Sequence, residues 1–296
     1  MNPLAGLLVI GKPSGMTSRR AVDLVGGLVR PAKTGHAGTL DPLASGVLVV
    51  AIGQATRLIE YVQAMPKSYM ATFLLGRTST TEDIEGKVTD LHDAPVPSRQ
   101  QIEHAAAGMV GEILQRPPAY SALKVSGRRA YKLARAGQEV ELAARPIYIH
   151  AIEVLDYAYP RLELRIECGS GTYVRSLGRD LAEAAGSGAV MSSLVRTAIG
   201  GFKLEHSVDP TSLARDSLQQ HLLPGVLAIR GQMGEHSVNE AEIAQLRNGL
   251  SIEIGQITDR AVAALDCGGE LVAVLARQAD GRYRASKFLR GVGELG

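Results

Sequence analysis

The sequence of 296 residues contains little cysteine, and its apolar runs are short. Cys168 and Cys267 lie far apart without CxxC spacing, which argues against a disulfide framework or a cysteine metal site. The longest apolar run, near residues 47–52, is far shorter than the ~20 residues that a membrane span requires. We therefore expect no membrane segment, a reducing cytoplasmic location, and two cysteines that act as small buried hydrophobic residues.

Several motifs of common enzyme classes are also missing. The sequence contains no complete phosphate loop, which would read GxxxxGK followed by Ser or Thr, and no GxSxG nucleophile motif, and its "GSGTYV" stretch has only two of the three dinucleotide-binding glycines. The start of the chain is apolar but has no basic leader, which favours a buried strand over a signal peptide. No His, Cys or Asp cluster shows metal-ligand spacing, so the sequence predicts a protein that uses no metal and no cofactor.

Charge is nearly balanced over the whole chain, with a formal net charge of +2, but it is segregated in one segment. Between residues 113 and 138 there is no acid, and the six basic residues are Arg116, Lys124, Arg128, Arg129, Lys132 and Arg135. A solvated helix face usually mixes both signs, whereas this pattern suits a polyanionic partner. We call residues 113–138 the basic segment.

Hydrophobic periodicity predicts an α+β fold. Strands are expected over residues 6–10, 47–52, 68–76, 151–159 and 161–168. Helices are expected after Thr17 or Ser18, from about Tyr173, and over residues 98–113, where Ile102, Ala106 and Val110 would form the apolar face. From Gly231 the pattern changes to one short helix and strands joined by Gly-Gly and Asp-Gly turns. This change predicts two domains, residues 1–230 and a small β-rich domain of residues 231–296.

Asp41 stands between a glycine-containing loop and a buried strand. Pro42 favours an extended backbone at Asp41, and Gly35 and Gly38 allow the preceding chain to turn sharply. A carboxylate held at a fixed point above a core suits a nucleophile or a base. The same carboxylate could instead cap a turn through its own backbone, as Asp before Pro often does. The local pattern leaves both interpretations open.

Longer motifs resemble the TruB family of tRNA pseudouridine synthases. "GHAGTLDPLASGVLVV" (residues 35–50) resembles the catalytic motif of that family, and "KPSGMTS" (residues 12–18) resembles its N-terminal motif. Three further stretches follow in the family's order, over residues 67–86, 117–137 and 171–181, so the resemblance covers most of residues 5–205. It implies a central, mostly antiparallel mixed sheet flanked by helices. Residues 231–296 match more weakly, where the family carries a PUA-type RNA-binding domain.

The resemblance implies an activity and three catalytic residues. The family converts one uridine in the T loop of tRNA, at position 55, to pseudouridine. Asp41 would be its essential carboxylate, which either attacks C1′ or removes the C2′ proton. Arg175 would pair with Asp41 and keep it ionised, and Tyr69 would stack on the base and assist removal of the C5 proton. Without the resemblance, Arg175 reads as a solvated helix residue and Tyr69 as a core aromatic.

The resemblance also assigns residues that bind the substrate. His36, Tyr173, Leu194 and Asp83 would line the pocket for the flipped-out uridine. On their own, Leu194 reads as ordinary core, Asp83 as a solvated carboxylate, and His36 as a residue hydrogen-bonded within its loop. Backbone phosphates of the tRNA T arm would be bound by Lys12, Lys124, Arg128, Arg129 and Lys132. Neither cofactor, metal, membrane nor protein partner is implied, and we expect a monomer.

The sequence departs from the family pattern at three positions, and its motifs leave two other functions open. Gly11, Thr80 and Val195 stand where the family often has two acids and a second arginine, which affects local contacts. A hydrolase that used His36 and Asp41 as an acid/base pair would release a product and need a second acid. A non-catalytic RNA-binding module would keep its affinity without Asp41.

Overall fold

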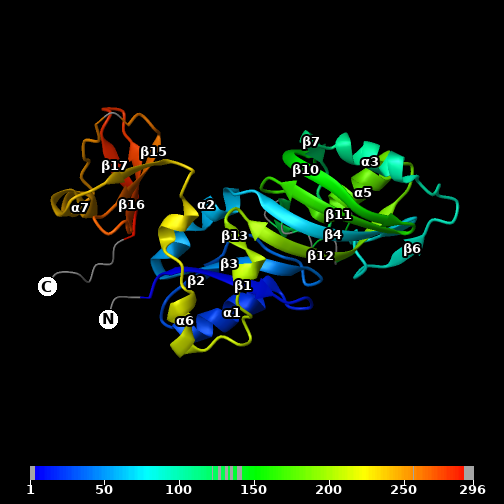
Figure 1. Ribbon diagram of the computed structural model, residues 1–296, viewed down its shortest axis with the longest axis horizontal. Coiled ribbons are helices and arrows are strands. Elements are labelled where there is room, and N and C mark those ends of the chain that lie inside the picture. Colours follow the sequence, from blue (N-terminus) through cyan, green and yellow to red (C-terminus); the bar gives the residue numbers. More distant parts are fainter. Residues whose placement is uncertain are drawn as a thin grey trace.

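The computed structural model describes residues 4–289, except residues 122, 126–127, 131–132, 134–135, 139–141 and 256. The two largest sheets of the described residues are a nine-stranded one in the first two thirds of the chain and a four-stranded one near the C-terminus (Figure 1). No helix in the described ranges is both long and apolar enough to cross a bilayer.

The large sheet has nine strands in the order β1-β3-β12-β4-β11-β10-β7, with β2 paired to β3 and β13 paired to β12. The strands are β1 (Gly6–Lys12), β2 (Thr34–His36), β3 (Ser45–Ile52), β4 (Lys67–Leu75), β7 (Gly111–Gln115), β10 (Arg145–Ala158), β11 (Arg161–Cys168), β12 (Ala189–Ile199) and β13 (Phe202–Lys203). β12 runs parallel to β3, and the other pairings are antiparallel. The predicted α+β class and mixed sheet are confirmed.

Helix α1 (Ser18–Val29) covers the β1–β3 end of this sheet. It begins where the sequence predicts, because Thr17 is the N-cap and its hydroxyl accepts a hydrogen bond from the Arg20 N–H at 3.1 Å. Its buried face meets the even-numbered residues of β1 and β3 in one core cluster. This packing fixes the direction in which the chain enters the loop that contains Asp41.

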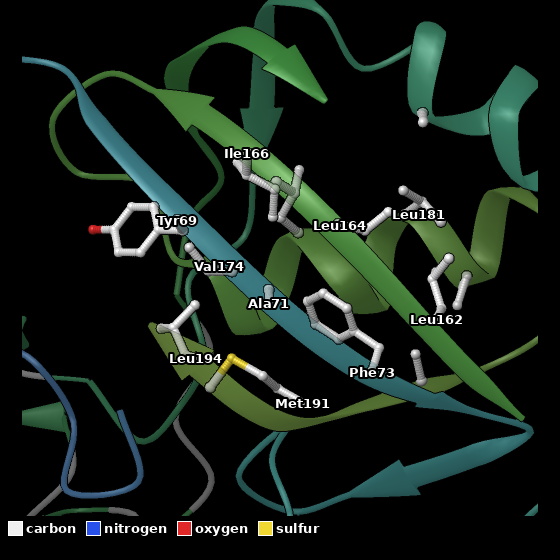
Figure 2. Close-up of a cluster of buried hydrophobic side chains, with 14 of the residues drawn as sticks. Tyr69, Ala71, Phe73, Leu162, Leu164, Ile166, Val174, Leu181, Met191 and Leu194 are labelled. Atoms are coloured by element: carbon white, nitrogen blue, oxygen red, sulfur yellow. The ribbon is translucent and has the colours of Figure 1, made fainter. Parts of the chain in front are cut away.

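A second cluster lies where α5 (Val174–Ala184) and α3 (Arg99–Ala107) pack on β4, β11 and β10. Figure 2 shows Phe73 of β4 beneath α5, among Leu162, Leu164 and Leu181. Gly178 of α5 makes this packing possible, because a Cβ atom there would lie 1.9 Å from Cε1 of Phe73. The missing side chain lets α5 rest directly on the strand, so the first turn of the helix lies close to the sheet.

The helix predicted over residues 98–113 is too long. The capping box of Ser98 and Gln101 starts α3 as expected, but the helix ends at Ala107 and β7 begins at Gly111. Val110, which fitted the helical period, lies outside the helix and is 48% exposed. Pairing of residues 111–115 with β10 outweighs the local periodicity here.

The remaining elements of the first two thirds connect these layers. They are η1 (Gly53–Leu58), α2 (Ile59–Ala64), β5 (Arg77–Ser79), β6 (Val88–Asp90), β8 (Lys124–Val125), β9 (Arg128–Arg129), η2 (Leu204–His206), α6 (Arg215–His221) and η3 (Gly225–Ala228). β5 pairs with β6, and β8 pairs with β9, each in a two-stranded sheet.

The C-terminal sheet has the order β14-β15-β16-β17 and its own core. Its elements are β14 (Gly234–Ser237), α7 (Glu240–Arg247), β15 (Ala261–Leu265), β16 (Leu271–Arg277) and β17 (Tyr283–Phe288). The predicted helix and turn-linked strands are confirmed. Cys168 is buried as expected, but Cys267 is exposed, because it lies in the turn closed by the Gly269 N–H and the Asp266 carbonyl group.

The small sheet touches the rest of the chain at η1 and α2. Arg57 donates to the Phe288 carbonyl group at 2.6 Å, and Lys287 forms an ion pair with Glu60. Ala263 and Val274 belong to the same apolar cluster as Leu58 and Val62 of the large unit. The division into domains at residue 230 stays a prediction.

Candidate active site

Asp41 lies in the loop between β2 and β3, residues 37–44, which we call the Asp41 loop. The segment of residues 12–18 holds this loop from one side, by hydrogen bonds to the backbone of the loop. Ser18 Oγ both donates to the Leu40 carbonyl group and accepts from the Leu40 N–H, each at 2.8 Å. Ser14 Oγ donates to the Leu43 carbonyl group, and the Gly15 N–H donates to the Pro42 carbonyl group at 2.7 Å. The two motifs therefore form one rigid unit.

Lys12 belongs to this unit as an internal support. Its side chain is buried, and Nζ donates to the carbonyl groups of Met16 at 2.6 Å, Pro13 at 2.9 Å and Pro42 at 3.5 Å. Burial lowers its pKa to about 8. An ammonium group used in this way is turned inward, whereas a phosphate contact needs it to turn outward, and the predicted binding of a tRNA phosphate by Lys12 stays a prediction.

Arg196 of β12 holds the loop from the opposite side. Nε donates to the Val47 carbonyl group at 2.7 Å, and Nη2 donates to the Gly38 carbonyl group at 3.1 Å. Gly46 permits this approach, because it has a φ of +106° and a Cβ atom there would lie 2.2 Å from the Arg196 carbonyl oxygen. The backbone on both sides of Asp41 is thus fixed by buried polar groups.

The Asp41 carboxylate meets the guanidinium group of Arg175 from the first turn of α5. Arg175 Nε lies 3.0 Å from Oδ2 of Asp41, and Nη1 lies 3.5 Å from Oδ2 of Asp83. The same guanidinium donates to the Thr81 carbonyl group at 2.6 Å and to the Tyr120 carbonyl group at 3.2 Å. Its side chain is 6% exposed, whereas that of Asp41 is 39% exposed. The carboxylate is therefore both fixed and accessible.

The segment of residues 81–85 supports Arg175 from behind. Asp83 is buried and accepts from Thr81 Oγ1 and from the Glu85 N–H. Glu82 has a φ of +64°, and its carboxylate accepts from Ser176 and pairs with Arg179 of α5. Burial raises the pKa of Glu82 above its ordinary value. These contacts fasten the N-terminal half of α5 to the segment and orient Arg175.

Two of the predicted base-pocket residues lie on neighbouring strands. Tyr69 of β4 and Leu194 of β12 are both buried members of the cluster shown in Figure 2. The ring of Tyr69 is at the end of that cluster, and its hydroxyl group points away from the other apolar side chains (Figure 2). Burial raises the pKa of Tyr69, and the adjacent guanidinium of Arg196 opposes part of that rise.

Tyr173 is the N-cap residue of α5, and Gln115 of β7 fixes its backbone. Gln115 donates to the Tyr173 carbonyl group at 3.1 Å and accepts from its N–H at 2.9 Å. The guanidinium carbon of Arg145 lies 5.2 Å from the ring centre of Tyr173, in cation–π geometry. The start of α5, which carries both Tyr173 and Arg175, is therefore held by two strands of the sheet.

His36 ends β2 just before the Asp41 loop. Burial lowers its pKa, a shift that a hydrogen bond with the Gly38 backbone partly opposes. Its Nδ1 atom is buried and has no hydrogen-bond partner among the described residues. At neutral pH this side chain is an uncharged ring with one unused polar atom directed into the protein.

The basic segment begins beside α5. The Tyr120 carbonyl group binds Arg175, and the Arg116 carbonyl group binds Arg179 at 3.0 Å. Lys124 and Arg129 are cross-strand partners in the β8–β9 pair, and Arg128 lies opposite Val125. The side chains of Lys124, Arg128 and Arg129, and all of Lys132, lie outside what the structure describes, so their predicted phosphate contacts stay predictions.

No three His, Cys, Asp or Glu side chains in the described parts of the chain are placed to hold a metal ion. The chemistry that the site itself offers is that of one accessible carboxylate. A buried guanidinium fixes this carboxylate, and a tyrosine and a leucine from adjacent strands lie in the nearby core.

Comparison with known proteins assigns the family. The sequence model described as "TruB family pseudouridylate synthase (N terminal domain)" matches residues 27–174. A curated relative from Dehalococcoides mccartyi, "tRNA pseudouridine synthase B", is 41% identical over 291 residues, which cover 96% of this chain and 97% of the relative. The chain belongs to the TruB family. A relative of the same name from Mycobacterium bovis is 40% identical over 96% of each chain.

The TruB family fold is also seen in solved structures. A chain in the "Crystal Structure of a Cbf5-Nop10-Gar1 Complex" matches with a TM-score of 0.73 and 25% identity, over 96% of this chain and 84% of that chain. A chain in the "Structure of H/ACA RNP bound to a substrate RNA containing 2'-deoxyuridine" gives the same TM-score at 24% identity. The family resemblance and the predicted pseudouridine synthase fold are therefore confirmed, and the protein is a pseudouridine synthase.

Sequence reasoning missed Arg196 and Gln115 in this TruB site. Val195 is the position of this strand that departs from the family pattern, but Arg196 beside it makes the contacts to the Asp41 loop. The available signal was that Arg196 is the one charged residue in the stretch of residues 189–199. Gln115 gave a weaker signal, as a polar residue directly after Ile113 and Leu114, and its complete burial is a finding of the structure.

Proposed function

We propose that this protein converts a uridine of tRNA to pseudouridine, at position 55 in the T loop, with Asp41 as the reacting carboxylate. The observation that carries the proposal is the pair of Asp41 and Arg175, in which an accessible carboxylate is held by an inaccessible guanidinium. The curated relatives named "tRNA pseudouridine synthase B" support tRNA as the substrate. A tRNA substrate implies a cytoplasmic location.

One carboxylate suffices for this reaction. The bond between C1′ and N1 breaks, a bond between C1′ and C5 forms, and the proton on C5 is replaced by one on N1. Product and substrate have the same composition, so the reaction consumes no oxidant and no nucleotide. Glycosidases need a second carboxyl group to protonate a poor leaving group, whereas uracil can leave as a delocalised anion.

The contacts of Asp41 favour this reaction over hydrolysis. A hydrolase with His36 and Asp41 as its acid/base pair needs a histidine that can give a proton to the leaving group, but the pKa of His36 is lowered by burial, and the ion-pair partner of Asp41 among the described residues is Arg175. His36 is instead suited to packing against a nucleotide, because its pKa is lowered and its ring is uncharged at neutral pH. A planar side chain can stack against a nucleotide and so lower the cost of extruding the base. This supports a position for His36 beside the flipped uridine.

Tyr69 and Leu194 supply walls for the base in this proposal, and Tyr173 adds an aromatic edge at the start of α5. Asp83 acts through Arg175, since it shares that guanidinium with Asp41. The basic segment would bind phosphates of the T arm next to the site, because Tyr120 and Arg116 of that segment touch α5 directly. The C-terminal sheet would bind a more distant part of the tRNA, and the protein would act as a monomer.

The test compares two aspartates of similar exposure. Asp41→Asn and Asp23→Asn are assayed on a tRNA transcript, and pseudouridine is mapped by carbodiimide treatment and reverse-transcription stops. Asp23 pairs with Arg19 on the surface of α1 and is 45% exposed, which makes it a matched control. We expect the stop at position 55 to vanish only for Asp41→Asn while tRNA binding persists. An undiminished stop in Asp41→Asn would end the catalytic assignment, and stops at other uridines would end the assignment of the position.

A further inference from the structure

Arg196 is a buried cation for which the proposed reaction has so far no use. Its side chain is 2% exposed, and it ranks among the largest fully buried side chains of the protein. No carboxylate in the described ranges forms an ion pair with it. Burying a guanidinium without an anionic partner is costly, so the contacts that it does make need an explanation.

These contacts converge on the two parts of the site that must act together. On one side, Nε and Nη2 bind the carbonyl groups of Val47 and Gly38, which lie on either side of Asp41 in the sequence. On the other side, Arg196 is the cross-strand partner of Tyr69 in the pairing of β12 with β4. Its guanidinium lies near enough to the phenol to oppose the burial-driven rise in the pKa of Tyr69.

The position of β12 makes this arrangement possible. β12 lies between β3, which follows the Asp41 loop, and β4, which carries Tyr69. It pairs Arg196 with Gly46 on one edge and with Tyr69 on the other. A single planar group with five N–H donors can therefore reach toward both neighbours at once.

We propose that Arg196 is a positioning residue, which holds the Asp41 loop and the Tyr69 ring at a fixed separation from beneath the site. The carboxylate must face the sugar while the tyrosine contacts the base of the same nucleotide, so an error in their separation misaligns one of the two. The role differs from that of Arg175, which contacts the carboxylate itself. It rests on the proposed function, because it needs both side chains to act on one uridine.

The test uses Arg196→Lys and Arg196→Met in the full chain. Arg165 of β11 gives the matched control Arg165→Met, because it is an exposed arginine of the same sheet, paired with Glu153. Each protein is mixed in excess with tRNA transcript labelled with tritium at C5 of uridine, and tritium release gives the single-turnover rate constant. The dissociation constant for tRNA and the unfolding temperature are measured in parallel.

We expect the rate constant of Arg196→Met to fall by about 100-fold, as a small misplacement of reacting groups can cause, and tRNA affinity to stay within about threefold. Arg196→Lys keeps the charge but cannot bridge two carbonyl groups in the same geometry, so we expect an intermediate rate constant. Arg165→Met should behave as wild type. This split between rate and affinity is not expected from general unfolding, which would reduce both.

A double-mutant cycle with Tyr69→Phe isolates the coupling. If Arg196 acts partly through the phenol, the loss of rate caused by Arg196→Lys is smaller in the Tyr69→Phe background than in wild type. Equal losses in both backgrounds, or wild-type rates in both Arg196 variants, would overturn the inference while leaving the proposed function standing. A wild-type chain that converts no uridine would overturn both.

Discussion

Nε of Arg175 lies 3.0 Å from Oδ2 of Asp41, and its Nη1 donates at 2.6 Å to the Thr81 carbonyl group. The guanidinium therefore joins the Asp41 loop to the segment that contains Asp83. Because the arginine is buried and the carboxylate is partly open, the pair has one free face. We expect a substrate to approach Asp41 on that face.

Replacement of Arg175 should show whether its positive charge is enough for activity or whether its planar guanidinium group is also needed to orient Asp41. Arg175→Lys keeps one positive charge but loses the planar fork that reaches two carboxylates and two carbonyl groups. We expect the single-turnover rate constant to fall by roughly 100-fold in Arg175→Lys and further in Arg175→Met. Arg99→Met, which removes an exposed arginine paired with Glu103 on α3, is the control. A wild-type rate in Arg175→Lys would contradict the assigned role.

The basic segment should control the salt dependence of tRNA binding. Simultaneous change of Arg128 and Arg129 to Ala should weaken binding and reduce the slope of log K against log salt by about one to two, because each phosphate contact releases a counterion. Lys12→Met should leave that slope unchanged, since the Lys12 ammonium group binds backbone carbonyl groups. Filter binding from low to high salt measures both, and an unaltered slope in the double variant would show that the segment faces elsewhere.

Lys12 should give the unfolding free energy a distinctive alkaline dependence. Its pKa falls from 10.5 in the free side chain to about 8 in the folded protein, because of burial. Between these values the unfolded chain holds the proton and the folded protein does not, so the unfolding free energy contributed by this group rises with pH. Below pH 8 both states are protonated and that contribution is constant.

Denaturant unfolding from pH 7 to 10 tests this behaviour in wild type and Lys12→Met. The wild-type protein should gain stability relative to Lys12→Met as the pH passes 8. Lys33→Met, at an exposed lysine just before β2, should follow wild type at every pH. Parallel curves for wild type and Lys12→Met would contradict the buried placement of the ammonium group.

Gly178 should tolerate no side chain. In Gly178→Ala the added methyl group would overlap the Phe73 ring, so the helix or the ring must shift, and we expect a loss of about 2–3 kcal/mol in unfolding free energy. Gly27→Ala in α1 is the matched helical control, because nothing lies within 4 Å of its Cβ position. There we expect a gain of about 0.5–1 kcal/mol from helix propensity. Equal effects at the two sites would show that α5 does not rest on Phe73.

The sequence was most informative where local chemistry determines structure. Thr17 and the Ser98–Gln101 capping box predicted two helix starts, because capping depends on residues only a few positions apart. The end of α3 was missed because pairing with β10 decides it, and β10 begins 30 or more residues later in the chain. Local periodicity contains no information about that partner.

The same limit applies to the site. The Asp41 loop was predicted from Pro42, the glycines and the following apolar run, all of which are neighbours of Asp41. The inward direction of Lys12 was not predicted, although two of the carbonyl groups that it binds, those of Pro13 and Met16, are close in the sequence; only the longer contact with the Pro42 carbonyl group comes from another part of the chain. Arg196 depends likewise on two carbonyl groups more than 140 residues away.

The place of β12 between β3 and β4 has a consequence for synthesis of the protein. A nascent chain that has emerged only as far as α5 already contains Asp41, Tyr69 and Arg175, but the strand that joins their two halves of the sheet is still missing. One edge of β4 and the part of the β3 edge at Ser45 and Gly46 stay open until residue 199 leaves the ribosome, and open edges favour misassociation. Chaperone dependence should therefore be greatest for chains truncated just before β12 and should drop once that strand is included.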